Sequence, residues 1–251
     1  MTDATTRFGG FAQEYDRVRP RPPAELVDLI TQWAGLSEPE VVDLGAGTGL
    51  STALWPDALG VEPDAGMRTV AAARGVRVVA GTAEATGLPD ACADIVTAGQ
   101  ALHWFDPART YPEIARVLRP GGVFAAFDCD WPPTVDPECD AVYREVEAHY
   151  RVLEVRHHVR PAYADKPDHV ARLRDSGLFR HVTEVALHSR DTGDAARFVD
   201  TLRSQGGVRA LLDRGLTEDE IGLTRLRGVA QRRLPHPRTW WWTYRVRLAA
   251  V

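Results

Sequence analysis

The chain has 251 residues, of which 44% are hydrophobic and 26% charged, a composition typical of globular proteins and not of disordered ones. Thirty basic and thirty-five acidic residues give a formal net charge of −5, which argues against a dedicated nucleic-acid-binding protein. Three cysteines cannot form an even set of disulfides, and none stands in a C-x-x-C pair, so neither a disulfide framework nor a zinc ribbon is predicted.

The sequence predicts neither a membrane-spanning segment nor a signal peptide. No apolar run approaches the roughly 18 residues that are needed to span a bilayer. The first ten residues lack the charged and apolar regions of a signal peptide. We therefore expect a cytoplasmic protein with no membrane partner.

The first half of the chain alternates short aliphatic runs with helical patterns. Residues 24–35 carry apolar side chains at helical spacing and end in Gly35, which predicts a helix. Five short aliphatic runs, each predicted to be a strand, stand at 41–44, 59–61, 76–80, 95–98 and 123–127. Strands buried on both faces have this composition, because crossover helices cover a parallel sheet above and below. The alternation predicts a doubly wound α/β fold.

After Asp128 the pattern changes. Helices are predicted over roughly 138–155 and 168–177, with mostly helical sequence over 194–233. Strands are predicted over 180–188 and 240–248. This order indicates a sheet extended to seven mostly parallel strands, with a small helical cap inserted between the last two.

A glycine-rich loop follows the first predicted strand, in the segment 41–49 (VVDLGAGTG). Glycines there let backbone N–H groups approach a ligand at the start of a helix. Position 50 is Leu, so the dinucleotide fingerprint G-x-G-x-x-G is absent, and no Gly-Lys-Ser/Thr follows as in a P-loop. Asp43, two positions before Gly45, would repel a pyrophosphate and suits a ligand with an ammonium or a hydroxyl group nearby.

Glu62 stands nineteen residues after Asp43, at the end of the second predicted strand. An acid at this place can accept hydrogen bonds from both ribose hydroxyls, each worth about 1.5–3 kcal/mol when desolvated. Loop and acid together predict a nucleoside ligand without phosphates. The alternatives are a tight turn with no ligand, and a Glu62 that merely neighbours the helix beginning at Pro63 and Asp64.

These motifs resemble, in order, those of the class I S-adenosylmethionine-dependent methyltransferases, in the branch called methyltransferase type 11 or UbiE-like. The resemblance covers about residues 8–128 and is looser toward the C-terminus. The matching segments are residues 43–49 with the family's first motif, 60–63 with its ribose acid, 81–84 and 87–90 with its adenine-side loop, 94–96 with its fourth strand and 116–122 with the turn into its fifth. Phe8, Ala12, Tyr15 and Arg19-Pro20 resemble the opening of the subgroup that includes trans-aconitate-type methyltransferases.

The resemblance implies a Rossmann-like fold that binds S-adenosylmethionine and releases S-adenosylhomocysteine. It implies one overall domain, with a cofactor-binding core and N-terminal lid over 1–128, and the rest of the sheet with substrate-cap helices over 129–251. The cofactor-contacting residues that it implies, together with those derived above, are Tyr15, Arg19, Asp43, Gly45, Ala46, Gly47, Glu62, Pro63, Met67, Ala83, Glu84 and Gln100.

Some of these residues have ordinary alternatives. Tyr15 and Arg19 share a helix face and are either a surface pair or a lid whose Arg binds the methionine carboxylate. Met67 is either core filler or a wall for the adenine ring. Thr82 stands where the family often has an Asp that contacts the adenine amino group, so Glu84 or the backbone would take that role.

Gln100 and His103 follow the fourth predicted strand, where open α/β sheets bind their ligands. His103 is the candidate catalytic residue, as a general base with an unperturbed pKa near 6.5. A structural or cofactor-packing role is the alternative. No metal site is predicted, because His149, His157 and His158 lack further ligands at a recognised spacing.

The predicted function is methyl transfer to an O, N or C nucleophile of a small molecule, mainly by proximity and orientation. One alternative is a cofactor-binding protein of the same fold with a regulatory or non-methyl-transfer role. Another is an RNA methyltransferase, since residues 203–251 hold ten arginines and four acids. Trp240–Trp242 are expected to pack in the core, with a homodimer contact as the second explanation.

Overall fold

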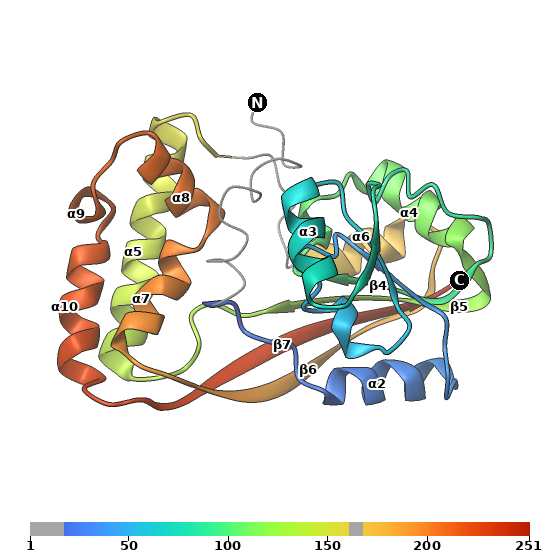
Figure 1. Cartoon of the computed structure of the whole chain (residues 1–251), viewed down its shortest axis with the longest axis horizontal. Helices are drawn as coiled ribbons and strands as arrows, with labels where there is room; N and C mark the ends of the chain where they lie inside the picture. The colour runs from blue at the N-terminus through green and yellow to red at the C-terminus, as the bar shows by residue number, and fades with distance from the viewer. Residues whose placement is uncertain (1–17, 161–167) are drawn as a thin grey trace.

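A computed structural model describes residues 18–160 and 168–251 (Figure 1). One seven-stranded sheet, in the order β3-β2-β1-β4-β5-β7-β6, runs through these residues. Its strands are β1 (Val41–Leu44), β2 (Leu59–Val61), β3 (Arg77–Val79), β4 (Ala93–Gly99), β5 (Leu118–Cys129), β6 (Arg180–Gly193) and β7 (Arg238–Ala250).

Strands β1 to β5 are parallel to one another, whereas β7 is antiparallel to both β5 and β6. Six of the seven strands therefore point the same way, which confirms the predicted doubly wound, mostly parallel sheet. The chain leaves β1 toward β2 on one side, and β4 returns to its other side, so the strand order reverses at β1. Asp43 on β1 pairs with Thr97 on β4 at this switch point, where open α/β sheets form their ligand crevice.

Helices cover both faces of the sheet, as the continuous apolar strands require. Helix α2 (Glu25–Ala34) buries Leu26 and Ile30 against one face, and it ends at Gly35 with a left-handed φ of 70°. Helices α4 (Pro107–Val117) and α6 (His169–Asp175) bury Ile114 and Leu173 against the other face. Helix α3 (Ala65–Ala73) links β2 to β3.

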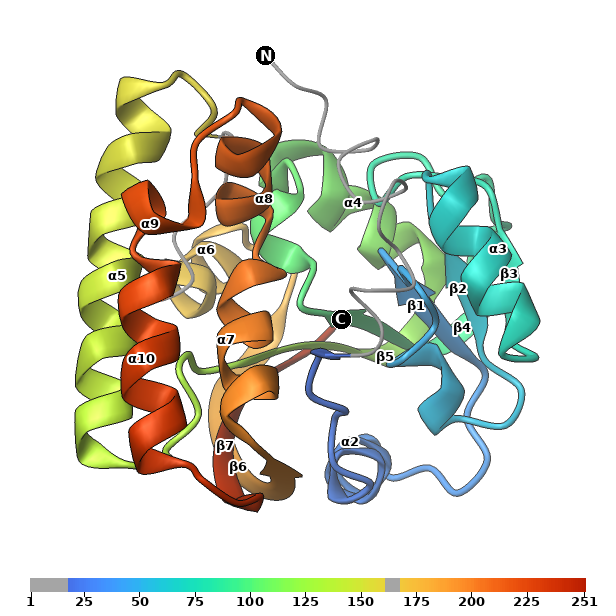
Figure 2. The ribbon, with the colours of Figure 1, turned by 60° about the vertical axis from the view of Figure 1, so that its left-hand side comes forward.

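A helical lobe stands at one end of the long β6–β7 pair (Figures 1 and 2). It consists of α5 (Pro137–Arg156), α7 (Ala195–Arg203), α8 (Gly206–Asp213), α9 (Glu218–Ile221) and α10 (Leu223–Arg233). Helix α10 packs against both α5 and α7. The prediction placed the lobe between the last two strands only; α5, which precedes β6, belongs to it as well, so the lobe is larger than predicted.

The two late strands are longer than the sequence indicated, because they continue beyond the sheet to carry the lobe. Along β7 the three indoles alternate: Trp240 and Trp242 are buried, and Trp241 is 50% exposed. Trp240 packs edge-on against Phe198 of α7, at a ring-centroid distance of 5.8 Å. Core packing thus explains two of the three indoles. In the described part of the chain, no helix has the length and apolar character needed to cross a membrane.

Packing of Trp240 against the backbone of Gly193 yields a stability prediction. A Cβ built on Gly193 would overlap the Trp240 indole. We expect Gly193→Ala to lower the free energy of unfolding by about 1–3 kcal/mol, measured by guanidinium titration, because the core must shift to accept it. The control is Gly228→Ala inside α10, whose added Cβ has its nearest neighbour at 3.9 Å. That variant should be about 0.5–1 kcal/mol more stable than the wild type. An unchanged stability for Gly193→Ala would contradict the described packing.

Candidate functional site

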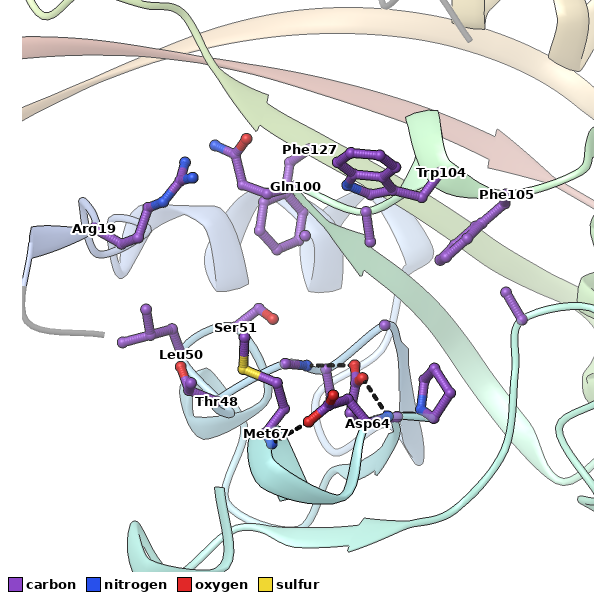
Figure 3. Close-up of a pocket in the computed structure, with 18 of the residues that line it drawn as sticks. Arg19, Thr48, Leu50, Ser51, Asp64, Met67, Gln100, Trp104, Phe105 and Phe127 are labelled. Carbon is purple, nitrogen blue, oxygen red and sulfur yellow. Dashed lines mark hydrogen bonds between the residues drawn. The ribbon is translucent and has the colours of Figure 1, made fainter. Parts of the chain in front are cut away.

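A cavity opens beyond the carboxyl ends of β1 and β4, at the switch point of the sheet (Figure 3). The cavity is partly open to solvent, and most of the surface that lines it is apolar. Ten of the predicted cofactor-contacting residues line it: Arg19, Gly45, Ala46, Gly47, Glu62, Pro63, Met67, Ala83, Glu84 and Gln100. Tyr15 and the first part of the predicted lid lie outside the described residues.

The glycine loop adopts a conformation that suits glycine alone. Gly45 and Gly47 have φ angles of 65° and 56°. The N–H groups of Gly45 and Ala46 both donate to the carbonyl of Val61, at 2.9 and 3.2 Å, and so fasten the loop to β2. A Cβ on Gly45 would lie 2.8 Å from the Ala101 side chain, whereas a Cβ on Gly47 would have its nearest neighbour, the Gly45 carbonyl oxygen, at 4.0 Å. The loop is therefore held from behind and leaves Gly47 at the cavity.

Asp43 does not line this cavity, in contrast to the predicted ligand contact. Its side chain is fully buried, and its carboxylate accepts hydrogen bonds from Ser51 Oγ and Thr52 Oγ1 at 2.6 Å and from Thr97 Oγ1 at 2.7 Å. Burial raises the pKa of this carboxyl, and the three hydroxyl donors oppose that rise. Asp43 thus ties β1, β4 and the segment after the glycine loop together beneath the site.

Glu62 connects the glycine loop with helix α3. Its Oε2 accepts from Gly47 N and its Oε1 from Asp64 N, both at 2.9 Å (Figure 3). The residue is only 7% exposed, and burial raises the pKa of its carboxyl. Each carboxylate oxygen offers two lone pairs, so both can accept one more hydrogen bond from a ligand in the cavity.

The wall next to Glu62 combines apolar and acidic side chains. Asp64 caps α3 by accepting from Met67 N at 2.8 Å, and Met67 is both 3% exposed and part of the cavity wall. Glu84 lines the cavity as well, and its Oε1 accepts from Asp106 N at 3.1 Å. Phe105 also lines the cavity, beside Trp104 (Figure 3), and no motif in the sequence indicated it.

The opposite wall carries Arg19, Gln100 and Trp104 (Figure 3). The Arg19 guanidinium lies 5.0 Å from the centroid of the Trp131 ring, and its Nη2 donates to the carbonyl of Ser204 at 3.5 Å. These contacts connect the segment before α2 with the helical lobe. Gln100 holds a left-handed φ of 55°, a strained conformation for a residue with a side chain, of the kind that gathers at functional sites.

His103 lies beside the cavity and is not among the residues that line it. Its ring packs next to Trp104, with the ring centroids 5.0 Å apart, and its Nδ1 is 3.6 Å from Asp128 Oδ1. The neighbouring Trp104, which no sequence motif indicated, forms part of the cavity wall. Within residues 18–160 and 168–251, no group of three or more His, Cys, Asp or Glu side chains could hold a metal ion.

The charges around the cavity favour a cationic or neutral ligand. Three carboxylates, those of Glu62, Asp64 and Glu84, line it against one guanidinium, Arg19, among the described residues. A phosphate beside the loop would face two of these carboxylates with no cation between them. The site therefore differs from a dinucleotide site in its electrostatics as well as in its glycine spacing.

Comparisons with known proteins agree with this geometry. A family model described as a methyltransferase domain matches residues 42–126. An uncharacterised methyltransferase of Mycobacterium tuberculosis is 44% identical over 126 residues, which cover 48% of this chain and 51% of that protein; the match thus spans about half the length of that relative. A malonyl-(acyl-carrier protein) O-methyltransferase of Herminiimonas arsenicoxydans is 31% identical over 213 residues, 79% of each chain.

Among solved structures, a candidate type II methyltransferase from Anaeromyxobacter dehalogenans has a TM-score of 0.67 at 26% identity, over 92% of this chain and 97% of the other. The YcgJ protein of Bacillus subtilis has a TM-score of 0.55 at 20% identity, over 91% and 98% of the two chains. The second likeness concerns the fold alone.

The three hydroxyls around Asp43 allow its structural role to be tested. Asp43→Ala should lower the free energy of unfolding by about 2–4 kcal/mol in urea titrations, because Ser51, Thr52 and Thr97 lose their acceptor and a void opens. Asp57→Ala, at an exposed position, is the control and should change stability by less than about 0.5 kcal/mol. Equal stabilities for the two variants would show that Asp43 does not hold the loop.

Proposed function

Because the chain belongs to the S-adenosylmethionine-dependent methyltransferases, we propose that it transfers the methyl group of this cofactor to an O, N or C nucleophile of a small molecule. The observation that carries the proposal is the acid-lined cavity at the switch point, with Glu62 between the glycine loop and α3. The Glu62 carboxylate can accept hydrogen bonds from ribose hydroxyls, while the carboxylates of Asp64 and Glu84 would repel a phosphate.

The residues present fit S-adenosylmethionine from end to end. Glu62 would accept hydrogen bonds from the ribose hydroxyls, and Met67 and Phe105 would enclose the adenine, with Glu84 within reach of its amino group. Arg19, on the opposite wall, would pair with the methionine carboxylate. When bound, the cofactor supplies an already activated methyl group on a sulfonium centre, so the protein needs no strong nucleophile of its own.

The chain's own contribution is mainly positioning. Holding the acceptor in line with the methyl group can lower the barrier by about 7–11 kcal/mol. Trp104, Phe105 and Phe127 give part of the cavity an apolar lining that solvates charge poorly. Such a lining would favour methyl transfer, because the sulfur loses its positive charge as the methyl group leaves. Contacts of Arg19 with Trp131 and Ser204 hold the Arg19 side chain at the cavity. His103, beside the cavity, is the proposed general base for acceptors that carry a proton.

An RNA acceptor is less well supported than a small molecule. Nine of the ten arginines in residues 203–251 form an ion pair with a carboxylate. Six of these nine pair with acids of residues 128–145, outside the segment, so those acids offset the local positive surplus. Phosphate binding depends on basic side chains that face solvent without such partners. The cytoplasmic location, the division at residue 128 and the homodimer stay predictions from the sequence.

Two measurements separate methyl transfer from cofactor binding without it. Incubation with S-adenosylmethionine and a panel of small acceptors should give a product 14 mass units heavier together with S-adenosylhomocysteine. Oxygen nucleophiles come first in the panel, because the relative from Herminiimonas arsenicoxydans is named an O-methyltransferase. Binding of S-adenosylhomocysteine with no product from any acceptor would favour the regulatory alternative.

Glu62→Gln tests the proposed ribose contact. Isothermal titration should show S-adenosylhomocysteine binding about 10- to 100-fold more weakly to this variant, because charge-assisted hydrogen bonds are lost. Glu38→Gln removes one negative charge at an exposed position and should bind like the wild type. Equal affinities for all three proteins would refute the contact.

The raised pKa of Glu62 adds a pH dependence of known sign. The carboxylate form accepts hydrogen bonds, and protonation removes part of this capacity. Because the pKa of Glu62 is raised from its ordinary value, the affinity for S-adenosylhomocysteine should fall as the pH is lowered, and this fall should begin at a higher pH than it would for an exposed Glu. In Glu62→Gln this part of the pH dependence should disappear; a slope that is the same in both proteins would assign it to another group.

A further inference from the structure

A buried ionic network lies behind the turn that carries His103, on the face of the sheet covered by α4 and α6. At its centre are Asp128 of β5, with a side chain 4% exposed, and Arg247 of β7, 2% exposed. Arg247 Nη1 is 2.8 Å from Asp128 Oδ2, and its Nε is 3.0 Å from Glu184 Oε2 on β6. The network therefore runs from a partly exposed acid at the edge strand to the carboxyl end of β5.

Such a network is a poor way to stabilise a sheet. Removing two charged groups from water costs several kcal/mol, which their mutual attraction recovers only in part, and apolar replacements are often equally stable. The same face of the sheet is otherwise packed with residues such as Phe124, Ala126 and Ala249. Because the network lies behind the turn that carries His103 and Trp104, its position indicates a role beyond packing.

The two oxygens of Asp128 face different partners. Oδ2 accepts from Arg247, while Oδ1 lies 3.6 Å from Nδ1 of His103. The His103 side chain is 12% exposed, and its neighbour Trp104 forms the cavity wall. Hydrogen bonds in catalytic pairs are often long before ligands bind and shorten in the complex. A carboxylate on the Nδ1 side selects the tautomer that carries its proton on Nδ1 and leaves Nε2 as the acceptor.

The other titratable and charged groups near His103 do not replace Asp128 as its neighbour. His169 of α6 is 1% exposed, and its pKa is lowered to about 4, chiefly by burial, so it is neutral at physiological pH. Arg172, one turn later on α6, lies 3.5 Å from His169 Nδ1. Glu184 approaches from β6 and is engaged by Arg247. Among the described residues, Asp128 is thus the carboxylate that faces His103, and Arg247 holds it.

We propose that Asp128 and Arg247 are positioning residues that hold His103 as the proton acceptor of the methyl transfer, an inference that rests on the proposed function. His103 Nε2 takes the proton of the acceptor's O–H or N–H group while the oxygen or nitrogen lone pair forms the bond to the methyl carbon. The bond from that carbon to sulfur breaks with its electron pair left on sulfur. The imidazolium is stabilised by Asp128 and returns its proton to water.

This role defines the substrate class. A carboxylate or a thiolate is already ionised near neutral pH and needs no base. A neutral alcohol, phenol or amide-type N–H must lose its proton as it attacks, and general bases accelerate such steps by about 10²- to 10⁴-fold. The network therefore favours acceptors with a protonated oxygen or nitrogen nucleophile.

The ring nitrogens of His103 can be observed without any acceptor. In full-length protein labelled with [15N]histidine, NMR at mildly alkaline pH should show His103 with its proton on Nδ1, the signal being assigned by its loss in His103→Gln. In Asp128→Asn, the Arg247 guanidinium can only donate hydrogen bonds, so the new amide turns its oxygen toward Arg247. Its NH2 group then faces His103 Nδ1 and needs an acceptor there. The imidazole proton should therefore move from Nδ1 to Nε2. A wild-type His103 protonated on Nε2, or a tautomer unchanged in Asp128→Asn, would overturn the proposal.

Asp130→Asn is the matched control, because Asp130, directly after β5, pairs with Arg245 of β7 at 3.0 Å but is 44% exposed. It should leave the tautomer unchanged. If Asp128→Asn does not fold, Arg247→Met replaces it; loss of the anchor should leave His103 in a mixture of both tautomers, and retention of the pure wild-type tautomer would count against the anchor.

Activity supplies the second readout, with whichever alcohol or phenol of the panel is methylated. His103→Gln and Asp128→Asn should lower kcat by about 10²-fold or more and flatten the acidic limb of its pH profile, with the Kd of S-adenosylhomocysteine unchanged. Undiminished kcat in His103→Gln would refute the base. Failure of the wild type to bind S-adenosylhomocysteine would instead refute the proposed function, and the tautomer measurement separates the two.

Discussion

The site depends on one buried carboxylate. Glu62 accepts hydrogen bonds from Gly47 and Asp64 and so fixes the glycine loop to the start of α3, and the same residue lines the cavity. A negative charge here suits sugar hydroxyls and opposes phosphate. Asp43 supports the arrangement from below, because its three hydroxyl donors hold the segment after the loop against β1 and β4. Loop, acid and switch point therefore specify one kind of ligand together.

Much of the fold could be predicted, because periodicity and turn residues are local signals. Strand β2 has the predicted bounds, and α2 ends at Gly35 as expected. Strands β6 and β7 were predicted too short, since their outer halves pair with each other beyond the main sheet and are specified by that pairing. Helix α5 belongs to the lobe because it packs against α10, about eighty residues further along the chain. No local sequence pattern encodes this contact.

The candidate site was predictable where a motif has a fixed offset. The glycine loop and Glu62 have one, and both lie at the cavity. The hydrogen bond between Asp43 and Thr97 could not be predicted from a motif, because Thr97 comes from β4 and only the folded register brings the two residues together. Trp104 and Phe127 were missed because an aromatic residue after or within a strand is usually core. Asp128 and Arg247 are 119 positions apart in sequence, and only the antiparallel pairing of β5 with β7 brings them into contact.

We propose that the first βα turn binds an adenosine carrying a sulfonium or thioether, and not one carrying a diphosphate. Titrating the wild-type protein separately with S-adenosylhomocysteine and with adenosine diphosphate tests this directly, since both share adenosine and differ beyond the ribose. The account predicts measurable binding of S-adenosylhomocysteine and at least about 100-fold weaker binding of the diphosphate. Equal or tighter binding of adenosine diphosphate would contradict it.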